Sequence, residues 1–126
     1  MIDHVSLGVS DEARAWAFYD AVMGALGFGR AYDKPPHVGY GRKHPVLWIG
    51  KPHDASRPAS PGHGVHVCLR AESREQVDRF HAAGLTGGGR DAGPPGLRPE
   101  YAANYYAAFL FDPDGNKIEA VCYLPT

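Results

Sequence analysis

The chain contains one short pattern twice, and this repeat limits the folds that it can adopt. His-Val, a small residue and Leu occur in HVSLGV at 4–9 and again in HVCLRA at 66–71, 62 positions later in a chain of 126 residues. The same offset aligns Phe18 with Phe80. A repeat of about half the chain predicts two similar modules, each built from the same order of elements.

Each copy of the pattern has the alternation of a β-strand. Val5 and Leu7 alternate with His4 in the first copy, and the second copy repeats this alternation after His66. Successive side chains of a strand point to opposite faces, so each histidine lies opposite to the aliphatic set. We expect helices to cover the aliphatic faces from outside, and the histidine faces to line a shared concave surface.

A helix is expected after each of these strands. Ser10 or Asp11 can cap the first helix, and Ser73 can cap the second, with Val77 and Phe80 on its inward side. Glycines are expected to end both helices, at Gly24 or Gly27 in the first and at Gly84 in the second.

The connection between the two halves is the stretch 51–64, which is rich in Pro, Ser and Gly. Short strands are expected before it, at 28–33, 38–42 and 46–50. After the second helix, a loop rich in glycine and proline at 86–100 hides at most one weak strand.

Two strands are expected at the end of the chain, around the turn DPDGN at 112–116. In the second of them, Ile118 and Glu119 point to opposite faces, which places Glu119 on the histidine side. The chain is therefore predicted to be a single α+β domain over residues 1–126. It divides into a first module of about 1–52, a linker of about 53–62 and a second module of about 63–126.

Composition excludes several classes of partner. The formal net charge is −1 and no block of like charges occurs, which argues against nucleic acid as the main partner. No apolar run approaches the roughly 20 residues of a membrane span, and the first strand leaves no room for a signal peptide. Cys68 and Cys122 lie in apolar strands and are expected to be free thiols in the cytoplasm, although a disulfide between them stays open.

The order of these motifs resembles that of the vicinal oxygen chelate superfamily, which includes glyoxalase I, bleomycin-resistance proteins, fosfomycin-resistance proteins and extradiol dioxygenases. The resemblance rests on four segments that span most of the chain: DHVSLGV at 3–9, AFYDAVMGALGF at 17–28, GVHVCLRA at 64–71 and FLFDPDGNKIEAV at 109–121. It implies two βαβββ modules whose mixed sheets curl around a cavity, with the helices outside. It also implies a homodimer, in which the site is formed within one chain or by modules of two chains.

The resemblance further implies a metal site, because metal-using members take ligands from the first strand of each module and from the last strand. Those positions are His4, His66 and Glu119 here. Two imidazoles and a carboxylate leave two or three positions on a divalent metal open to substrate, and Fe²⁺, Mn²⁺, Ni²⁺, Co²⁺ and Zn²⁺ all fit. Such a site can polarise an oxygen of a small-molecule substrate. The alternative, that each of the three is a surface or core residue without a ligand role, stays open.

One departure from glyoxalase I concerns its fourth ligand, a Glu or Gln near the end of the first module's last strand. The matching strand is VLWIG at 46–50, and its nearest positions are Leu47 and Trp48. Glyoxalase I activity proper is therefore not expected. The leading hypothesis is a cytoplasmic metalloenzyme of lyase, isomerase or oxygenase type. The alternative is a metal-free protein of the bleomycin-resistance type that binds a small molecule or an antibiotic.

Five further residues are candidates for the cavity. Tyr105 could donate a proton or a hydrogen bond to an oxygen of the substrate, and Phe109 shares its strand face. Trp48 would offer a flat wall for a planar ligand. Arg98 and Tyr101 could close over the substrate. For Tyr105 and Trp48, simple packing is the equal alternative.

Overall fold

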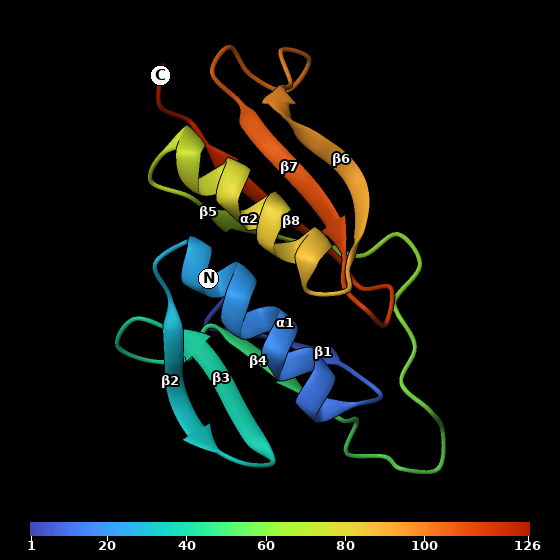
Figure 1. Ribbon diagram of the computed structural model, residues 1–126. Helices are drawn as coiled ribbons and strands as arrows, with labels where there is room; N and C mark the ends of the chain where they lie inside the picture. Colours follow the sequence, from blue (N-terminus) through green and yellow to red (C-terminus); the bar gives the residue numbers. More distant parts are fainter.

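The computed structural model describes all residues from Met1 to Thr126 and arranges them as two modules of the same design (Figure 1). The first module contains β1 (Val5–Gly8), α1 (Glu12–Ala25), β2 (Gly29–Lys34), β3 (His37–Gly41) and β4 (Leu47–Gly50). The second contains β5 (His66–Arg70), α2 (Arg74–Thr86), β6 (Arg90–Leu97), β7 (Tyr106–Phe111) and β8 (Lys117–Cys122). Both modules therefore have the order βαβββ, as the repeat predicts.

Each module forms its own four-stranded mixed sheet. The strand orders are β1-β4-β3-β2 in the first sheet and β5-β8-β7-β6 in the second. In both sheets the first strand pairs in parallel with the last strand of its module, and the remaining pairs are antiparallel. The predicted α+β class is confirmed, and the sheets stay separate and close no barrel.

The predicted caps define the starts of both helices. The Asp11 side chain accepts a hydrogen bond from the backbone N–H of Arg14, and Ser73 does the same for Gln76. Buried residues in both helices follow the spacing of a single apolar face. They are Ala15, Phe18, Tyr19, Val22 and Met23 in α1, and Val77, Phe80, His81 and Gly84 in α2.

The predicted end of the second helix is wrong. Helix α2 continues past Gly84 to Thr86 and is capped by Gly87. Gly84 has a packing role instead, because a Cβ atom there would lie 2.2 Å from Cδ1 of Leu110. The first helix ends near its predicted glycines, after Ala25, with Gly27 at a φ of +83°.

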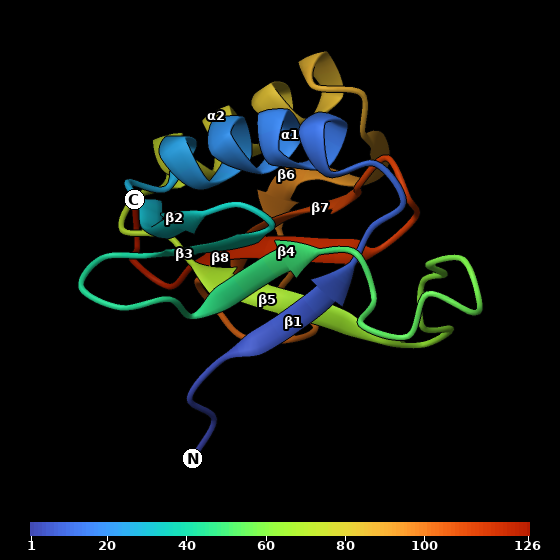
Figure 2. The same ribbon diagram turned by 90° about the horizontal axis from the view of Figure 1, so that it is seen from below.

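The helices lie side by side on one side of the molecule and the sheets on the other (Figure 2). One continuous hydrophobic core includes Phe18 of α1, Phe80 of α2, Ile49 of the first sheet and Leu110 of the second. The core thus joins the two modules through their helices. Each sheet keeps a second face, directed away from the helices, which we call its open face.

The turn between β7 and β8 is a second joint between the modules. Asp112 is buried and accepts hydrogen bonds from the hydroxyl of Tyr19 at 2.7 Å and from the side chain of Asn116 at 2.9 Å. The same side chain of Asn116 donates to the carbonyl of Gly8 at 3.0 Å. The DPDGN turn therefore ties the second sheet to the start of the first module.

The shorter strands of the first module lie within one residue of the expected bounds. In the second module, the strand inside the loop at 86–100 is β6, which is eight residues long. Its pairing with β7 is irregular around Gly93 and Gly96. The guanidinium of Arg98 donates to the carbonyls of Pro94 and Gly96 at 2.7 and 2.8 Å, which holds this strand in place.

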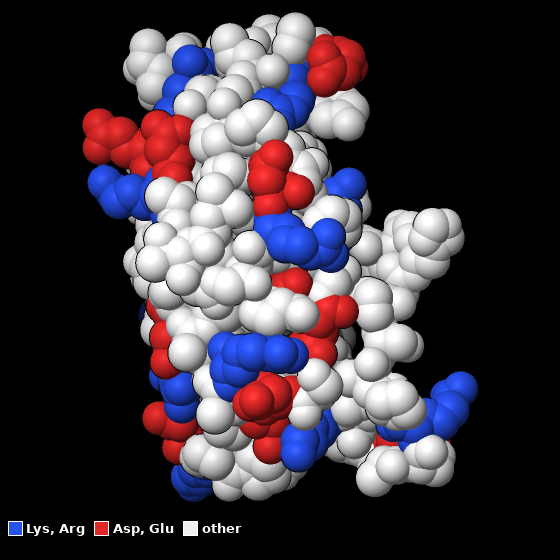
Figure 3. Space-filling model, turned by 45° about the vertical axis from the view of Figure 1, so that its right-hand side comes forward, with Lys and Arg blue, Asp and Glu red and all other residues white.

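Charged side chains of both signs are interspersed on the face drawn in Figure 3. None of the helices has the length and apolar character needed to cross a membrane.

Candidate functional site

The open face of the second sheet carries a row of four cross-strand neighbours. Glu119 of β8 lies between Cys68 of β5 and Phe109 of β7, and Phe109 in turn pairs with Gly93 of β6. We call these four residues the glutamate row. The neighbours of Glu119 along β8, Ile118 and Ala120, point into the core, as the alternation predicts.

Glu119 is the centre of this face. Its side chain is only 2% exposed, and a buried carboxylate is costly unless it is paired. Its Oε1 atom lies 3.0 Å from Nε2 of His66, whose side chain is 44% exposed. His66 is the only basic group within salt-bridge distance of this carboxylate. A cation that reached Glu119 from solvent would therefore meet His66 beside it.

The other oxygen of Glu119 accepts a hydrogen bond from the hydroxyl of Tyr105 at 2.5 Å. Burial and this hydrogen bond raise the pKa of Tyr105, so its hydroxyl stays protonated and remains a donor at neutral pH. Loss of hydration and the charge of Glu119 also raise the pKa of Cys68, to about 12. The carboxylate thus has one oxygen fixed by Tyr105 and one directed at His66.

The remaining predicted residues of the second module surround this group. The ring of Phe109 lies 6.2 Å from that of His66, and the guanidinium of Arg98 lies over the Phe109 ring at 5.5 Å from its centre. Tyr101 packs edge-on against Tyr105 at 5.1 Å and is 63% exposed. The structure therefore brings together His66, Glu119, Tyr105 and Phe109, with Arg98 and Tyr101 at the rim.

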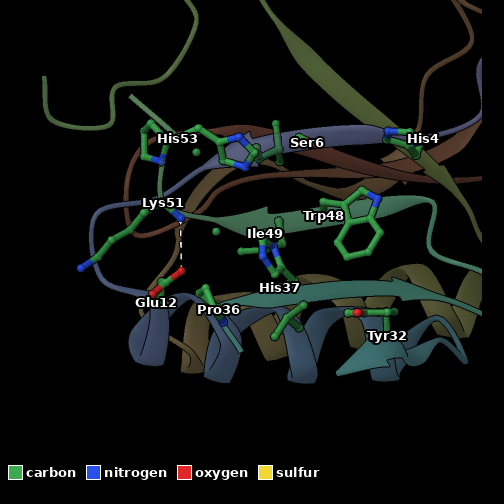
Figure 4. A pocket seen from close by; sticks show the side chains of 15 residues that line it. His4, Ser6, Glu12, Tyr32, Pro36, His37, Trp48, Ile49, Lys51 and His53 are labelled. Carbon is green, nitrogen blue, oxygen red and sulfur yellow. Dashed lines mark hydrogen bonds between the residues drawn. The ribbon is translucent and has the colours of Figure 1, made fainter. Parts of the chain in front are cut away.

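The open face of the first sheet carries a matching row. Trp48 of β4 lies between Ser6 of β1 and Gly39 of β3, and Gly39 in turn pairs with Tyr32 of β2. We call these four residues the tryptophan row. Ser6, Tyr32 and Trp48 of this row border a pocket of about 880 Å³ that is open to solvent (Figure 4). His4, His37 and Trp48 contribute to its lining.

His4 lies on this first face, apart from the other two predicted ligands. Its Nδ1 atom is 2.6 Å from a carboxylate oxygen of Asp3, and this contact lowers the pKa of Asp3. No group of three His, Cys, Asp or Glu side chains within the chain is placed to hold a metal ion. One chain therefore brings His66 and Glu119 together and leaves His4 on the other sheet.

The donor atoms that do converge fit a divalent metal. Two ligand bonds of roughly 2.1 Å at right angles would place their donor atoms roughly 3 Å apart. The separation of Nε2 of His66 and Oε1 of Glu119 is 3.0 Å. The separation of these two atoms would thus suit neighbouring ligands of one ion.

Sequence reasoning missed three residues of these faces. Tyr32 borders the pocket because β2 bulges between Arg30 and Tyr32, and no signal in the sequence marks the bulge. Cys68 faces Glu119, and its place follows from the alternation that located His66. Gly39 is hidden under Trp48, which depends on cross-strand register.

The family model described as the Glyoxalase/Bleomycin resistance protein/Dioxygenase superfamily matches residues 1–120. The chain belongs to this superfamily. The match includes both modules, both open faces and all three predicted ligand positions.

Solved structures agree with this assignment. A glyoxalase/bleomycin resistance protein from Albidiferax ferrireducens is 39% identical, with a TM-score of 0.83 over 94% of this chain and 95% of that one. A glyoxalase/bleomycin resistance protein/dioxygenase family enzyme from Burkholderia phytofirmans is 19% identical, with a TM-score of 0.71 and 98% of both chains covered. A lactoylglutathione lyase from Agrobacterium tumefaciens is also 19% identical, with a TM-score of 0.64 over 97% of this chain and 92% of that one. The last two show a shared fold. A search of functionally curated proteins gave no match.

Proposed function

We propose that the protein is a metal-dependent enzyme that acts on an oxygen-bearing small molecule, with His66, Glu119 and His4 as the ligands of a divalent metal. The observation that carries this proposal is the buried Glu119, whose Oε1 lies 3.0 Å from Nε2 of His66 on a face open to solvent. A carboxylate and an imidazole at this separation suit Fe²⁺, Mn²⁺, Ni²⁺, Co²⁺ or Zn²⁺.

His4 would come from a second copy of the chain. The two sheets share no strand pairing within one chain, and no three-ligand group forms there. In a symmetric homodimer, the first sheet of one chain can face the second sheet of its partner, and symmetry then creates two equal sites. Exposed aromatic side chains on or beside the open faces support such a contact, since Tyr32, Tyr101 and Tyr123 are 38%, 63% and 43% exposed.

The chain's own residues would share the work at this site. When bound, the metal would polarise an oxygen of the substrate and stabilise the negative charge that develops on it. Tyr105 would hold Oε2 of Glu119 and so direct Oε1 toward His66, which makes it a positioning residue. Asp3 accepts from Nδ1 of His4 and leaves Nε2 of that ring as the ligand atom. Phe109, with Arg98 and Tyr101 at the rim, would border the substrate.

Glyoxalase I activity proper is not part of this proposal. The register places Trp48 at the position in the first sheet that matches Glu119 in the second. An indole cannot ligate a metal or exchange a proton there as a carboxylate would. Likeness of fold to the lactoylglutathione lyase at 19% identity does not replace this missing group.

A second candidate function is binding of a small molecule without metal, as in the bleomycin-resistance part of the superfamily. The pocket of about 880 Å³ on the first sheet favours it, because Trp48 and its neighbours line this pocket independently of Glu119. Pockets of this volume hold drug-sized ligands. Measured metal affinity separates the two functions.

The test is a titration of the metal-stripped protein with Mn²⁺ and with Zn²⁺, in which calorimetry measures the binding affinity. We expect saturable binding by the wild type and at least roughly a hundredfold weaker binding by His66→Ala and Glu119→Gln. His63→Ala is the matched control, because His63 is an exposed histidine of the connecting segment and should leave binding unchanged. Equal affinities of wild type, His66→Ala and Glu119→Gln would reject the metal site.

The place of action that we propose is the cytoplasm. Cys68 and Cys122 are both free thiols, in keeping with a reducing compartment. Localisation of a tagged protein in its native host would test this.

A further inference from the structure

The two open faces carry side chains of different chemistry at the centres of their rows. Both sheets have the same strand order, and in both the last strand of the module lies between the first strand and the third. When the rows are aligned strand by strand, Trp48 occupies the position equivalent to Glu119, and Ser6 the position equivalent to Cys68. The position that holds the buried carboxylate in one half therefore holds an indole in the other.

The indole of Trp48 packs against Gly39, which we call its glycine seat. A Cβ atom on Gly39 would lie 2.8 Å from Cε3 of Trp48 and 2.6 Å from Cβ of Pro45. Any side chain at position 39 would therefore displace the ring or the following loop. Because Gly39 is the cross-strand partner of Trp48, the glycine lets the ring lie against the backbone of β3.

The seated ring borders the pocket. Trp48 is among the lining residues and stays partly exposed, and Figure 4 shows its ring projecting from β4. The ring of Tyr32 lies 5.5 Å away, tilted by 58°. Around the indole the strands carry small residues, Ser6, Gly8 and Gly50, which keep the pocket open. A fixed, flat aromatic surface beside an open volume of this kind is suited to another flat ring.

We propose that the ligand of this pocket contains a flat, unsaturated ring, and that this ring stacks on Trp48 with Tyr32 at its edge. This names the substrate class of the site described above and rests on the proposed function only in treating both open faces as parts of one site. Ring recognition itself needs no metal. It depends on the indole, its glycine seat and the open pocket, which residues 4–53 of one chain form.

The test compares naphthoate with decahydronaphthoate, which has the same carbon skeleton and carboxylate but no flat ring. Calorimetry is carried out on the metal-stripped protein in the presence of a chelator. We expect naphthoate to bind roughly fivefold or more tightly than its saturated analogue. Trp48→Leu, which keeps an apolar side chain, should abolish the preference, and Trp48→Phe should retain part of it.

The glycine seat has its own matched pair of variants. Gly39→Ala should reduce the preference for naphthoate by displacing the indole. Gly29→Ala, in the same sheet, should keep it, because a Cβ atom at Gly29 meets nothing within 4 Å. Circular dichroism shows whether each variant is folded. If Gly39→Ala does not fold, Trp48→Leu still tests the proposal.

Three results would overturn the inference: no measurable binding of naphthoate, equal affinity of the wild type for both probes, or an unchanged preference in Trp48→Leu. The metal titration of the wild type is read separately. Loss of metal binding with an intact ring preference rejects the metalloenzyme and leaves this inference standing, and the opposite pattern rejects only this inference.

Discussion

The tryptophan row and the glutamate row occupy matching places on two sheets of the same topology, yet they carry different chemistry. The glutamate row centres on a buried carboxylate beside an imidazole, and the tryptophan row centres on an indole seated on a glycine. Behind both rows the same kind of residue fills the core, such as Ile49 in the first sheet and Ile118 in the second. The two halves thus have similar residues on the core-facing sides of their sheets and different residues on their open faces.

In the proposed function, this difference divides the tasks of the site between the two halves. The second half offers two ligand atoms and the residue that positions them, whereas the first half offers His4 and a pocket with a flat wall. Neither half is complete by itself, since no three-ligand group forms within the chain. On the proposed function, a single chain would carry two unlike half-sites, and a pair of chains would join them.

The largest effect on stability is expected in the turn between β7 and β8, which connects the two modules. Asp112→Ala removes a buried acceptor from Tyr19 and from the side chain of Asn116. We expect the free energy of unfolding to fall by about 3 kcal/mol, because these donors are left without partners. Urea denaturation followed by circular dichroism measures it. Asp54→Ala, which removes an exposed carboxylate bonded only to Ser56, is the control and should change little. Equal losses of unfolding free energy in the two variants would show that the hydrogen bonds of Asp112 do not stabilise the fold.

The comparison of the rows is tested most directly by making them alike. Trp48→Glu places a carboxylate on the face that carries His4, at the position that matches Glu119. We expect the affinity for Zn²⁺ to rise about tenfold, since a fourth ligand joins the site, and the preference for naphthoate to disappear. Calorimetry with each ligand measures both. Trp48→Gln controls for loss of the ring without a gain of charge. A zinc affinity no higher in the Glu variant than in the Gln variant would separate Trp48 from the metal site.

A smaller effect on stability is expected from a glycine substitution in the second helix. Gly84→Ala in α2 would bring a Cβ atom to 2.2 Å from Leu110, so the helix or the leucine must shift. We expect a loss of about 2 kcal/mol in the free energy of unfolding, as for overpacked cores. Thermal and urea denaturation provide the measurement. A gain in stability would mean that Gly84 has no packing role.

The smallest effect is expected at Gly24, near the end of the first helix. Gly24 in α1 is exposed, and a Cβ atom there meets nothing within 4 Å. Gly24→Ala should therefore raise the free energy of unfolding by up to about 1 kcal/mol through helix propensity alone. The same denaturation experiment measures it. Opposite signs at Gly24 and Gly84 are the expected pattern, and a loss at Gly24 would contradict it.

Much of the fold followed from the repeat and the alternation of side chains. The period of two placed His66 and Glu119 on one face, because parity along a strand survives folding. The strand VLWIG contains no carboxylate or amide, so the sequence predicts that the fourth ligand implied by the resemblance to glyoxalase I is absent. The caps at Asp11 and Ser73 were readable because capping is a local interaction.

Features that depend on contacts between distant segments could not be read in the same way. The sequence predicts a helix end at Gly84, because no local pattern indicates the contact of this glycine with Leu110. The eight-residue strand β6 was hard to see, since its glycines and prolines break the alternation and Arg98 holds its end from outside the strand. The separation of His4 from His66 depends on how the modules pack, which no local pattern encodes.

The central claim, that two chains complete one metal site, is tested by combining defective chains. His4→Ala and His66→Ala chains are co-expressed with different affinity tags, and the heterodimer is isolated through both tags. We predict one metal site per heterodimer against two in the wild type, because His4 of one chain would meet His66 and Glu119 of the other. The pair His66→Ala and Glu119→Gln should give none, since both lesions lie in the same half. A heterodimer of His4→Ala and His66→Ala that binds no metal, while the wild type does, would contradict the account.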